Sequence, residues 1–143
     1  MKIREINSGD HSNLIEFFAN TPGVTVREAD SREATKMYLE RNPGLNFIAE
    51  MDNKIIGCVM CGHDGRRGYL QHLVVRLEYR NQGLGRQLFS LCIDALGKIG
   101  INKTHIFVFK DNDVANKFWL RQGWSIRDDL NMYSYNATSN PNA

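Results

Sequence analysis

The chain has 143 residues, 42% of them hydrophobic and 24% charged, which is the usual composition of one globular domain with a real core. Its net charge of +2 is too small to favour nucleic acid or an anionic membrane as the main partner, and no apolar run approaches the roughly 18 residues of a membrane span. The N-terminus lacks a signal-peptide pattern, so we expect a cytoplasmic protein with reduced cysteines.

The first part of the chain combines helix signals with short apolar strands. Polar capping residues precede runs with apolar residues at helical spacing, and turn residues follow them. Asp52-Asn53 is a dipeptide typical of a tight hairpin turn. The expected elements are a strand at residues 2–6, a helix from Ser8 or Asp10 to about Ala19, a helix from Ser31 to about Arg41, and hairpin strands at residues 46–51 and 54–61.

The central stretch is YLQHLVVRLEYRNQGLGR, at residues 69–86. Its apolar residues 70–75 predict a buried strand, and apolar residues recur at helical spacing from Leu84. A strand, a glycine-bearing turn and a helix in this order direct several free backbone N–H groups at one spot. Gly83 and Gly85 let a ligand approach the backbone, so we expect a phosphate-binding turn. A helix start without a ligand is the alternative, while the spacing fits neither a P-loop nor a dinucleotide fingerprint.

The last third of the chain predicts a strand–helix pair and a polar end. Residues 103–109 (KTHIFVF) are β-branched and aromatic, which predicts a strand parallel to the one at residues 70–75. The remaining expected elements are a helix at residues 112–121 that Gly123 ends, and short closing strands at residues 124–126 and 132–135.

Cys58 and Cys61 form a C-x-x-C, a spacing that can indicate redox or metal chemistry. They lie within IIGCVMCG, which predicts a strand, where positions i and i+3 face opposite sides. No histidine has ligand spacing to them. We therefore expect buried cysteines that pack as small hydrophobic residues, and no metal site.

Two blocks carry a resemblance to a known family. Arg80, Gly83 and Gly85 match the acyl-CoA signature R/Q-x-x-G-x-G/A. Residues 112–124 match a second hallmark, N-x-x-A-x-x-F-Y-x-x-x-G-F. The matching positions of this second block are Asn112, Ala115, Phe118 and Gly123. In this order the two blocks resemble the GNAT superfamily of N-acetyltransferases, over roughly residues 46–126.

The resemblance implies an α/β (α+β) fold, in which a mixed, mostly antiparallel sheet of about six or seven strands carries helices on both faces. It implies one acetyltransferase domain over residues 1–136, followed by a disordered tail at residues 137–143. Either a monomer or a homodimer is compatible with it.

The resemblance also implies acetyl-CoA as co-substrate, with an amine as the acceptor and with neither nucleic acid nor membrane as a partner. The pantetheine arm would add to the main chain of residues 73–75 as an extra strand, and the pyrophosphate would lie on N–H groups of the turn. The residues expected to bind acetyl-CoA are Leu73, Val74, Val75, Arg80, Asn81, Gln82, Gly83, Leu84, Gly85, Arg86, Asn112 and Phe118.

The implied chemistry is direct transfer, in which an amine attacks the thioester carbonyl and a main-chain N–H near Val74 stabilises the oxyanion. Most of an alkyl amine is protonated at neutral pH, so a base or a water chain must remove a proton. Tyr69 is the catalytic candidate for such a relay, and a strand tyrosine with its hydroxyl in solvent is the alternative. His72 is either turned towards the site by a β-bulge or a structural histidine.

The sequence departs from the family at Trp119, where a tyrosine usually acts as general acid to the departing sulfur. An indole N–H cannot usefully protonate a thiolate, so we expect Trp119 to be a packed aromatic residue. Tyr133 or Tyr135 could substitute for the missing tyrosine. The alternative function is a catalytically degenerate acyl-CoA-binding regulatory module. The acceptor could be a protein N-terminus, a lysine or a small-molecule amine.

Overall fold

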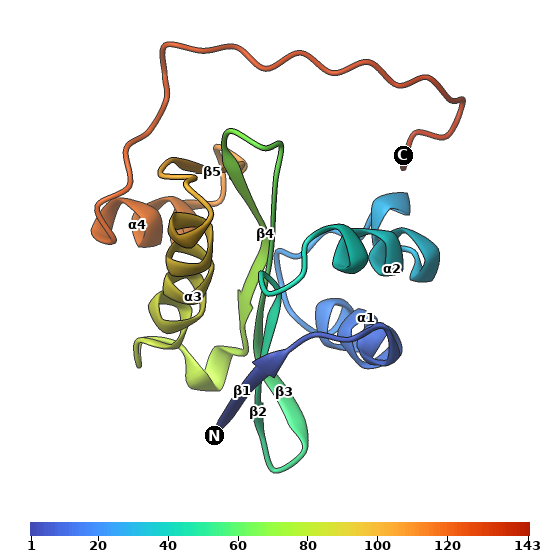
Figure 1. The fold of residues 1–143 in the computed structure, drawn as a ribbon, viewed down its shortest axis with the longest axis vertical. Helices are drawn as coiled ribbons and strands as arrows, with labels where there is room; N and C mark the ends of the chain where they lie inside the picture. The colour runs from blue at the N-terminus through green and yellow to red at the C-terminus, as the bar shows by residue number, and fades with distance from the viewer. The chain divides into compact units, whose positions relative to one another are not determined.

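The computed structural model describes residues 1–143 and divides into two compact units, residues 1–107 and residues 108–143. A five-stranded sheet in the order β1-β2-β3-β4-β5 forms the centre of the first unit (Figure 1). The first four strands pair antiparallel, and β5 pairs parallel to β4. The strands are β1 (Lys2–Glu5), β2 (Phe47–Met51), β3 (Lys54–His63), β4 (Gly68–Val75) and β5 (Thr104–Ile106).

Helices cover both faces of this sheet. In Figure 1, α1 (His11–Ala19) and α2 (Arg32–Arg41) lie on one side of it and α3 (Leu84–Lys98) lies on the other. The second unit contains α4 (Asp113–Arg121). Short 3-10 turns are η1 (Ser8–Asp10), η2 (Glu28–Asp30) and η3 (Leu77–Tyr79). None of the helices has the length and apolar character that crossing a bilayer requires.

The mixed sheet with helices on both faces is confirmed, but the sheet has fewer strands than predicted. Residues 124–126 and 132–135, expected to close it, pair with no strand. Their side chains are largely in solvent, with Ile126 71% exposed and Tyr133 89% exposed. A β-favouring run describes side chains that suit a pleated surface, and it forms a strand only where a partner edge is available. The sheet therefore has five strands instead of six or seven.

The hairpin between β2 and β3 forms as predicted. Asp52 and Asn53 both have left-handed backbone, with φ of 52° and 62°. Positive φ at both central residues is the type I′ geometry, which matches the twist of the flanking strands and which Asn and Asp tolerate. Met51 and Lys54 are consequently paired across the turn.

The two faces of β3 pack against different helices. A Cβ on Gly57 would lie 3.2 Å from the side chain of Leu88 in α3, whereas Cys58 belongs to the apolar cluster that includes α1 residues. Cys61 instead interacts with Cys92 of α3, which lowers the pKa of the Cys61 thiol, so Cys58 and Cys61 face opposite sides of the sheet, as predicted. Burial raises the pKa of Cys58, which keeps this thiol protonated.

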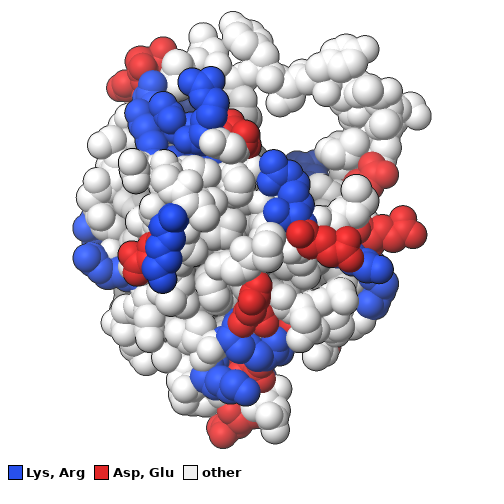
Figure 2. All heavy atoms as spheres, in the orientation of Figure 1, with Lys and Arg blue, Asp and Glu red and all other residues white.

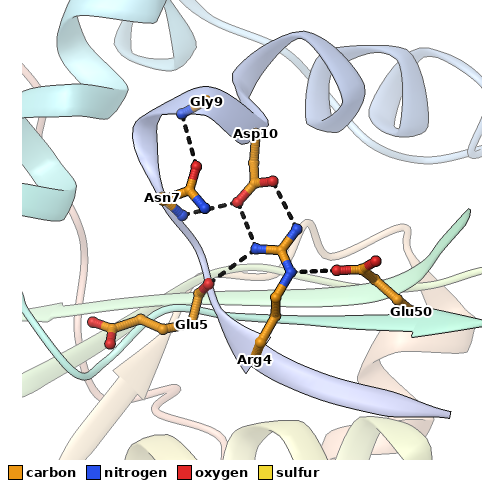
Figure 3. A network of polar contacts seen from close by, with 6 residues as sticks. All are labelled: Arg4, Glu5, Asn7, Gly9, Asp10 and Glu50. Carbon is orange, nitrogen blue, oxygen red and sulfur yellow. Dashed lines mark hydrogen bonds and ion pairs between the residues drawn. The ribbon is translucent and has the colours of Figure 1, made fainter. Parts of the chain in front are cut away.

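A polar network centred on Arg4 connects β1 to the start of α1 (Figure 3). The guanidinium donates two hydrogen bonds of 2.8 Å to the carboxylate of Asp10 and pairs with Glu50 of β2. Asp10 also accepts a hydrogen bond from the N–H of Asn7, and the side chain of Asn7 caps η1 in place of the predicted Ser8 or Asp10. The hydrogen bond from Arg4 outweighs burial and holds the pKa of Asp10 below its usual value.

Asp10→Asn is expected to lower the free energy of unfolding at neutral pH by about 1–3 kcal/mol, because Arg4 loses a charged acceptor. A carboxylate with a lowered folded-state pKa stabilises the fold above its unfolded pKa of about 3.9, and this contribution is lost as the pH falls through the folded pKa. Urea unfolding should therefore separate wild type from Asp10→Asn at about pH 7, and the difference should shrink as the pH falls below the unfolded pKa and through the lowered folded-state pKa of Asp10. Asp94→Asn, at an exposed position of α3, is the control. A difference that does not shrink as the pH falls would contradict the assignment.

Candidate functional site

The turn before α3 presents backbone N–H groups that have no acceptor in the chain. Gly83 is the N-cap, with a left-handed φ of 82°, and no side chain caps this helix. The N–H groups of residues 82–85 make no hydrogen bond to the protein. A Cβ on Gly83 would meet no atom within 4 Å, so this side of the turn is open. Free N–H groups at the positive end of a helix dipole favour the binding of an anion.

Arg80 holds this turn against the end of β4. Its Nε donates a hydrogen bond of 2.9 Å to the carbonyl oxygen of Val75, the last residue of the strand. Asn81 follows with a left-handed φ of 62°, and the side chain of Gln82 donates to the carbonyl of Glu78 at 3.3 Å. These contacts fix the path of the chain from β4 into the turn.

β4 and β5 are paired over only a short distance. The ladder runs from Gly68↔Thr104 to Leu70↔Ile106 and then stops, while β4 continues to Val75. Residues 71–75 therefore have no neighbouring strand on the β5 side, although β3 pairs with them on the other side. The open strand edge leads directly to the turn that contains Gly83.

Tyr69 lies on the sheet face that α1 and α2 cover. Its cross-strand partner is Gly62, where a Cβ would lie 2.9 Å from the hydroxyl of Tyr38 in α2, and directly paired residues face the same side. The Tyr69 ring contacts two other rings from the β5 segment, with centroid distances of 5.7 Å to His105 and 6.2 Å to Phe107. Phe107 is 61% exposed, so these rings form an aromatic surface that solvent can reach.

A β-bulge in β4 sets the orientation of His72. The register between β3 and β4 shifts between Cys58 and Met60, and His72 has a left-handed φ of 45°. The Nε2 atom of His72 lies 2.6 Å from Oδ1 of Asp30, and the imidazole stacks on Phe18 with a centroid distance of 4.6 Å. The β-bulge at His72, which was one of the alternatives that the sequence allowed, is therefore present.

Asp30 is held as a carboxylate. Burial acts to raise the pKa of Asp30, but the hydrogen bonds from His72 and from the N–H of Arg27, with the charges of His72 and His11, outweigh burial and hold the pKa below its usual value. The Arg27 N–H donates to Oδ2 at 2.8 Å, and Nε2 of His11 donates to the carbonyl oxygen of Asp30 at 2.7 Å.

In Figure 2, Lys and Arg side chains gather at the upper left of the face shown, and elsewhere on it basic and acidic side chains are interspersed with wide uncharged areas. A hollow of about 320 Å³ lies between α1 and the β2–β3 turn, around Phe17 and Lys54. None of the residues expected to bind acetyl-CoA lines this hollow. The open edge of β4 and the turn before α3 are therefore the candidate site.

A family model described as the acetyltransferase (GNAT) family matches residues 11–124. This range contains β4, the turn before α3, and α4. The chain belongs to the GNAT acetyltransferase family.

Individual GNAT relatives match over different lengths. An acetyltransferase of Pectobacterium atrosepticum is 37% identical over 77 residues, so the match spans 54% of this chain and little more than half, 55%, of that protein. N-alpha-acetyltransferase 30 of Schizosaccharomyces pombe is 28% identical over 118 residues, which are 79% of each chain. The structure of PaiA N-acetyltransferase from Thermoplasma acidophilum, in complex with coenzyme A, has the same fold, with a TM-score of 0.78 at 22% identity, covering 89% of this chain and 91% of that one.

The second GNAT motif block forms α4 and its cap. Asn112 caps the helix, since its side-chain oxygen accepts a hydrogen bond of 3.1 Å from the N–H of Ala115. Trp119 is only 7% exposed and contacts Trp124 and Phe118, with ring centroids at 4.5 Å and 5.1 Å. Trp119 is therefore a packed aromatic residue, as predicted.

Two features of this candidate site were not predicted. The first is His105, which is paired with Tyr69 across the parallel ladder. The sequences of the two strands do not show which of their residues are paired. The second is the contact between His72 and Asp30, which are 42 residues apart. The only signal for it was a histidine inside the apolar run of residues 70–75.

Proposed function

We propose that this GNAT chain transfers an acetyl group from acetyl-CoA to a primary amine by direct attack within a ternary complex. The observation that carries the proposal is the open edge of β4 that ends at a turn of free N–H groups. An extended thioester arm can add to such an edge through main-chain hydrogen bonds, and a diphosphate can lie on such a turn. Membership of the GNAT family supports acetyl-CoA as the donor.

The proposed contacts with acetyl-CoA follow this geometry. The main chain of Leu73, Val74 and Val75 would bind the pantetheine arm. The acetyltransferase domain would extend over residues 1–136. The remaining proposed contacts are Arg80, Asn81, Gln82, Gly83, Leu84, Gly85 and Arg86 in the turn, and Asn112 and Phe118 in the second unit.

In the proposed reaction, the amine nitrogen attacks the carbonyl carbon of the thioester and forms a tetrahedral oxyanion. A main-chain N–H near Val74 would stabilise that oxyanion. The C–S bond then breaks, and CoA leaves as a thiolate. A thiol with a pKa of about 8.5 leaves without strong acid assistance, so Trp119 in place of a tyrosine does not prevent turnover. Tyr69, within the exposed aromatic surface, would relay a proton through water.

Trp119 favours one other candidate function, an acyl-CoA-binding regulatory module without turnover. Its indole N–H cannot usefully protonate the departing sulfur, and its ring is packed among aromatic residues. The two candidates share the binding site and differ only in turnover.

The test is thiol release from acetyl-CoA with a panel of primary amines: peptides with a free N-terminus, free lysine, a polyamine and an aminoglycoside. Turnover with intersecting initial-velocity lines would support direct transfer, whereas the parallel lines of a ping-pong mechanism would contradict it. CoA binding in calorimetry without thiol release on any amine would support the regulatory module instead.

A further inference from the structure

His72 occupies an unusual position within β4. It is a non-glycine residue with a left-handed φ of 45°, a conformation that only a few per cent of non-glycine residues adopt, His, Asn and Asp more often than the others. The bulge places its ring between Phe18 of α1 and Asp30 of η2, and its side chain is 19% exposed. Strained backbone that persists around a polar side chain is typical of functional positions.

Asp30 is fixed on its other sides as well. Its Oδ2 accepts a hydrogen bond of 2.8 Å from the N–H of Arg27, and its carbonyl oxygen accepts hydrogen bonds from His11 at 2.7 Å and from Thr35 at 3.4 Å. The Asp30 side chain is only 13% exposed. The carboxylate is therefore a rigid partner for His72 rather than a mobile surface acid.

This contact determines which nitrogen of His72 carries the proton. A carboxylate can only accept a hydrogen bond, so Nε2, at 2.6 Å from Oδ1 of Asp30, must be the donor. In the neutral ring the lone pair is then on Nδ1, which makes no hydrogen bond to the protein. The arrangement is that of a base oriented by an acid, in which one nitrogen is held and the other is left to accept a proton.

His72 also lies beside the proposed reaction centre. It directly precedes Leu73 and Val74, whose main chain is proposed to bind the thioester, and it lies on the same sheet side as Tyr69. We propose that His72 is the general base of this chain and that Asp30 is its positioning residue. This inference rests on the proposed function.

In the step proposed, Nδ1 of His72 accepts one proton from the acceptor ammonium, directly or through one water. The freed lone pair of the amine forms the new C–N bond, the C–S bond breaks, and the electron pair leaves with the CoA sulfur. The neutral amide product forms when the nitrogen loses its second proton to solvent. Asp30 remains ionised throughout and stabilises the imidazolium that forms.

The decisive variant is His72→Gly, because glycine accepts the left-handed backbone and leaves a space beside Phe18 that imidazole can enter. We expect kcat/KM with the best amine of the panel to fall about 10²–10⁴-fold while the Kd for CoA is unchanged. Millimolar imidazole should restore part of kcat in His72→Gly and none in wild type. Asp30→Asn should lower kcat with little change in KM, whereas Asp94→Asn should match wild type.

The outcomes distinguish a failure of the His72 assignment from a failure of the proposed acetyl transfer. If the wild-type protein shows no turnover on any amine, the proposed function is wrong, and so is the assignment of His72 as its general base. Wild-type turnover with less than about a tenfold loss in His72→Gly, or a loss that imidazole does not rescue, overturns the base alone. A readout independent of activity is the ¹⁵N spectrum of the histidine rings in wild type, where we expect the Nε2–H tautomer at His72. The Nδ1–H tautomer would overturn the proposal even if every variant failed to fold.

Discussion

Gly83→Val is expected to weaken CoA binding by more than about 100-fold, or about 2.7 kcal/mol of binding free energy. The valine side chain would fill the open side of the turn, where the diphosphate is proposed to contact the N–H groups. A Cβ at this position would meet no atom of the chain within 4 Å, so the steric cost falls on the ligand and not on the core. Calorimetric titration with CoA measures the effect.

Gly100→Val is the matched control for this variant. Gly100 follows the other end of α3, has a left-handed φ of 86°, and likewise has no atom within 4 Å of an added Cβ. Both variants should lose about 1–2 kcal/mol of unfolding free energy from left-handed strain, so they differ only in where the side chain projects. Equal CoA affinity in the two variants would show that the pyrophosphate does not lie on the turn at Gly83.

Asn46→Ala is expected to give the largest loss of stability, about 3–5 kcal/mol of unfolding free energy. Asn46 is 1% exposed, and its side chain completes the pairing between two chain segments. Its Oδ1 accepts from the N–H of Cys61 at 2.9 Å, and its Nδ2 donates to the carbonyl oxygens of Cys61 and Asn42 at 3.3 Å and 3.2 Å. Alanine would leave these buried backbone groups without a partner, each at a cost of about 1–3 kcal/mol.

Thermal and urea unfolding check this prediction, with an expected fall in Tm of roughly 10–17 °C. Asn20→Ala is the control, since Asn20 is exposed and its side chain makes a similar hydrogen bond, of 2.9 Å, to the carbonyl of Glu16. We expect that substitution to change the unfolding free energy by less than about 0.5 kcal/mol. A loss below about 1 kcal/mol in Asn46→Ala would mean that water replaces the amide, which would contradict the proposed role.

The sequence predicted turns and helix caps correctly where the residues that form them are close together in the chain. Asp52-Asn53 has the left-handed turn that its side chains tolerate, Ser31 caps α2 through the N–H of Ala34, and Gly83 has the positive φ of the turn before α3. The opposite orientation of Cys58 and Cys61 also follows from the alternation of side chains along a strand. The family was recognisable before any contact was known because its two motif blocks, at residues 80–85 and 112–124, are likewise made of residues close together in the chain.

The sequence by itself thus determined the GNAT family and the glycine-bearing turn before α3, because each depends on residues a few positions apart, and the fold class followed from the family resemblance. Only the tertiary structure decided the pairing of His72 with Asp30, the rings around Tyr69, and the absence of strands at residues 124–126 and 132–135, which favour β structure but have no partner edge. The physical reason is that a hydrogen bond or strand pairing over long sequence separation depends on where several elements meet, and no single stretch of chain encodes that position.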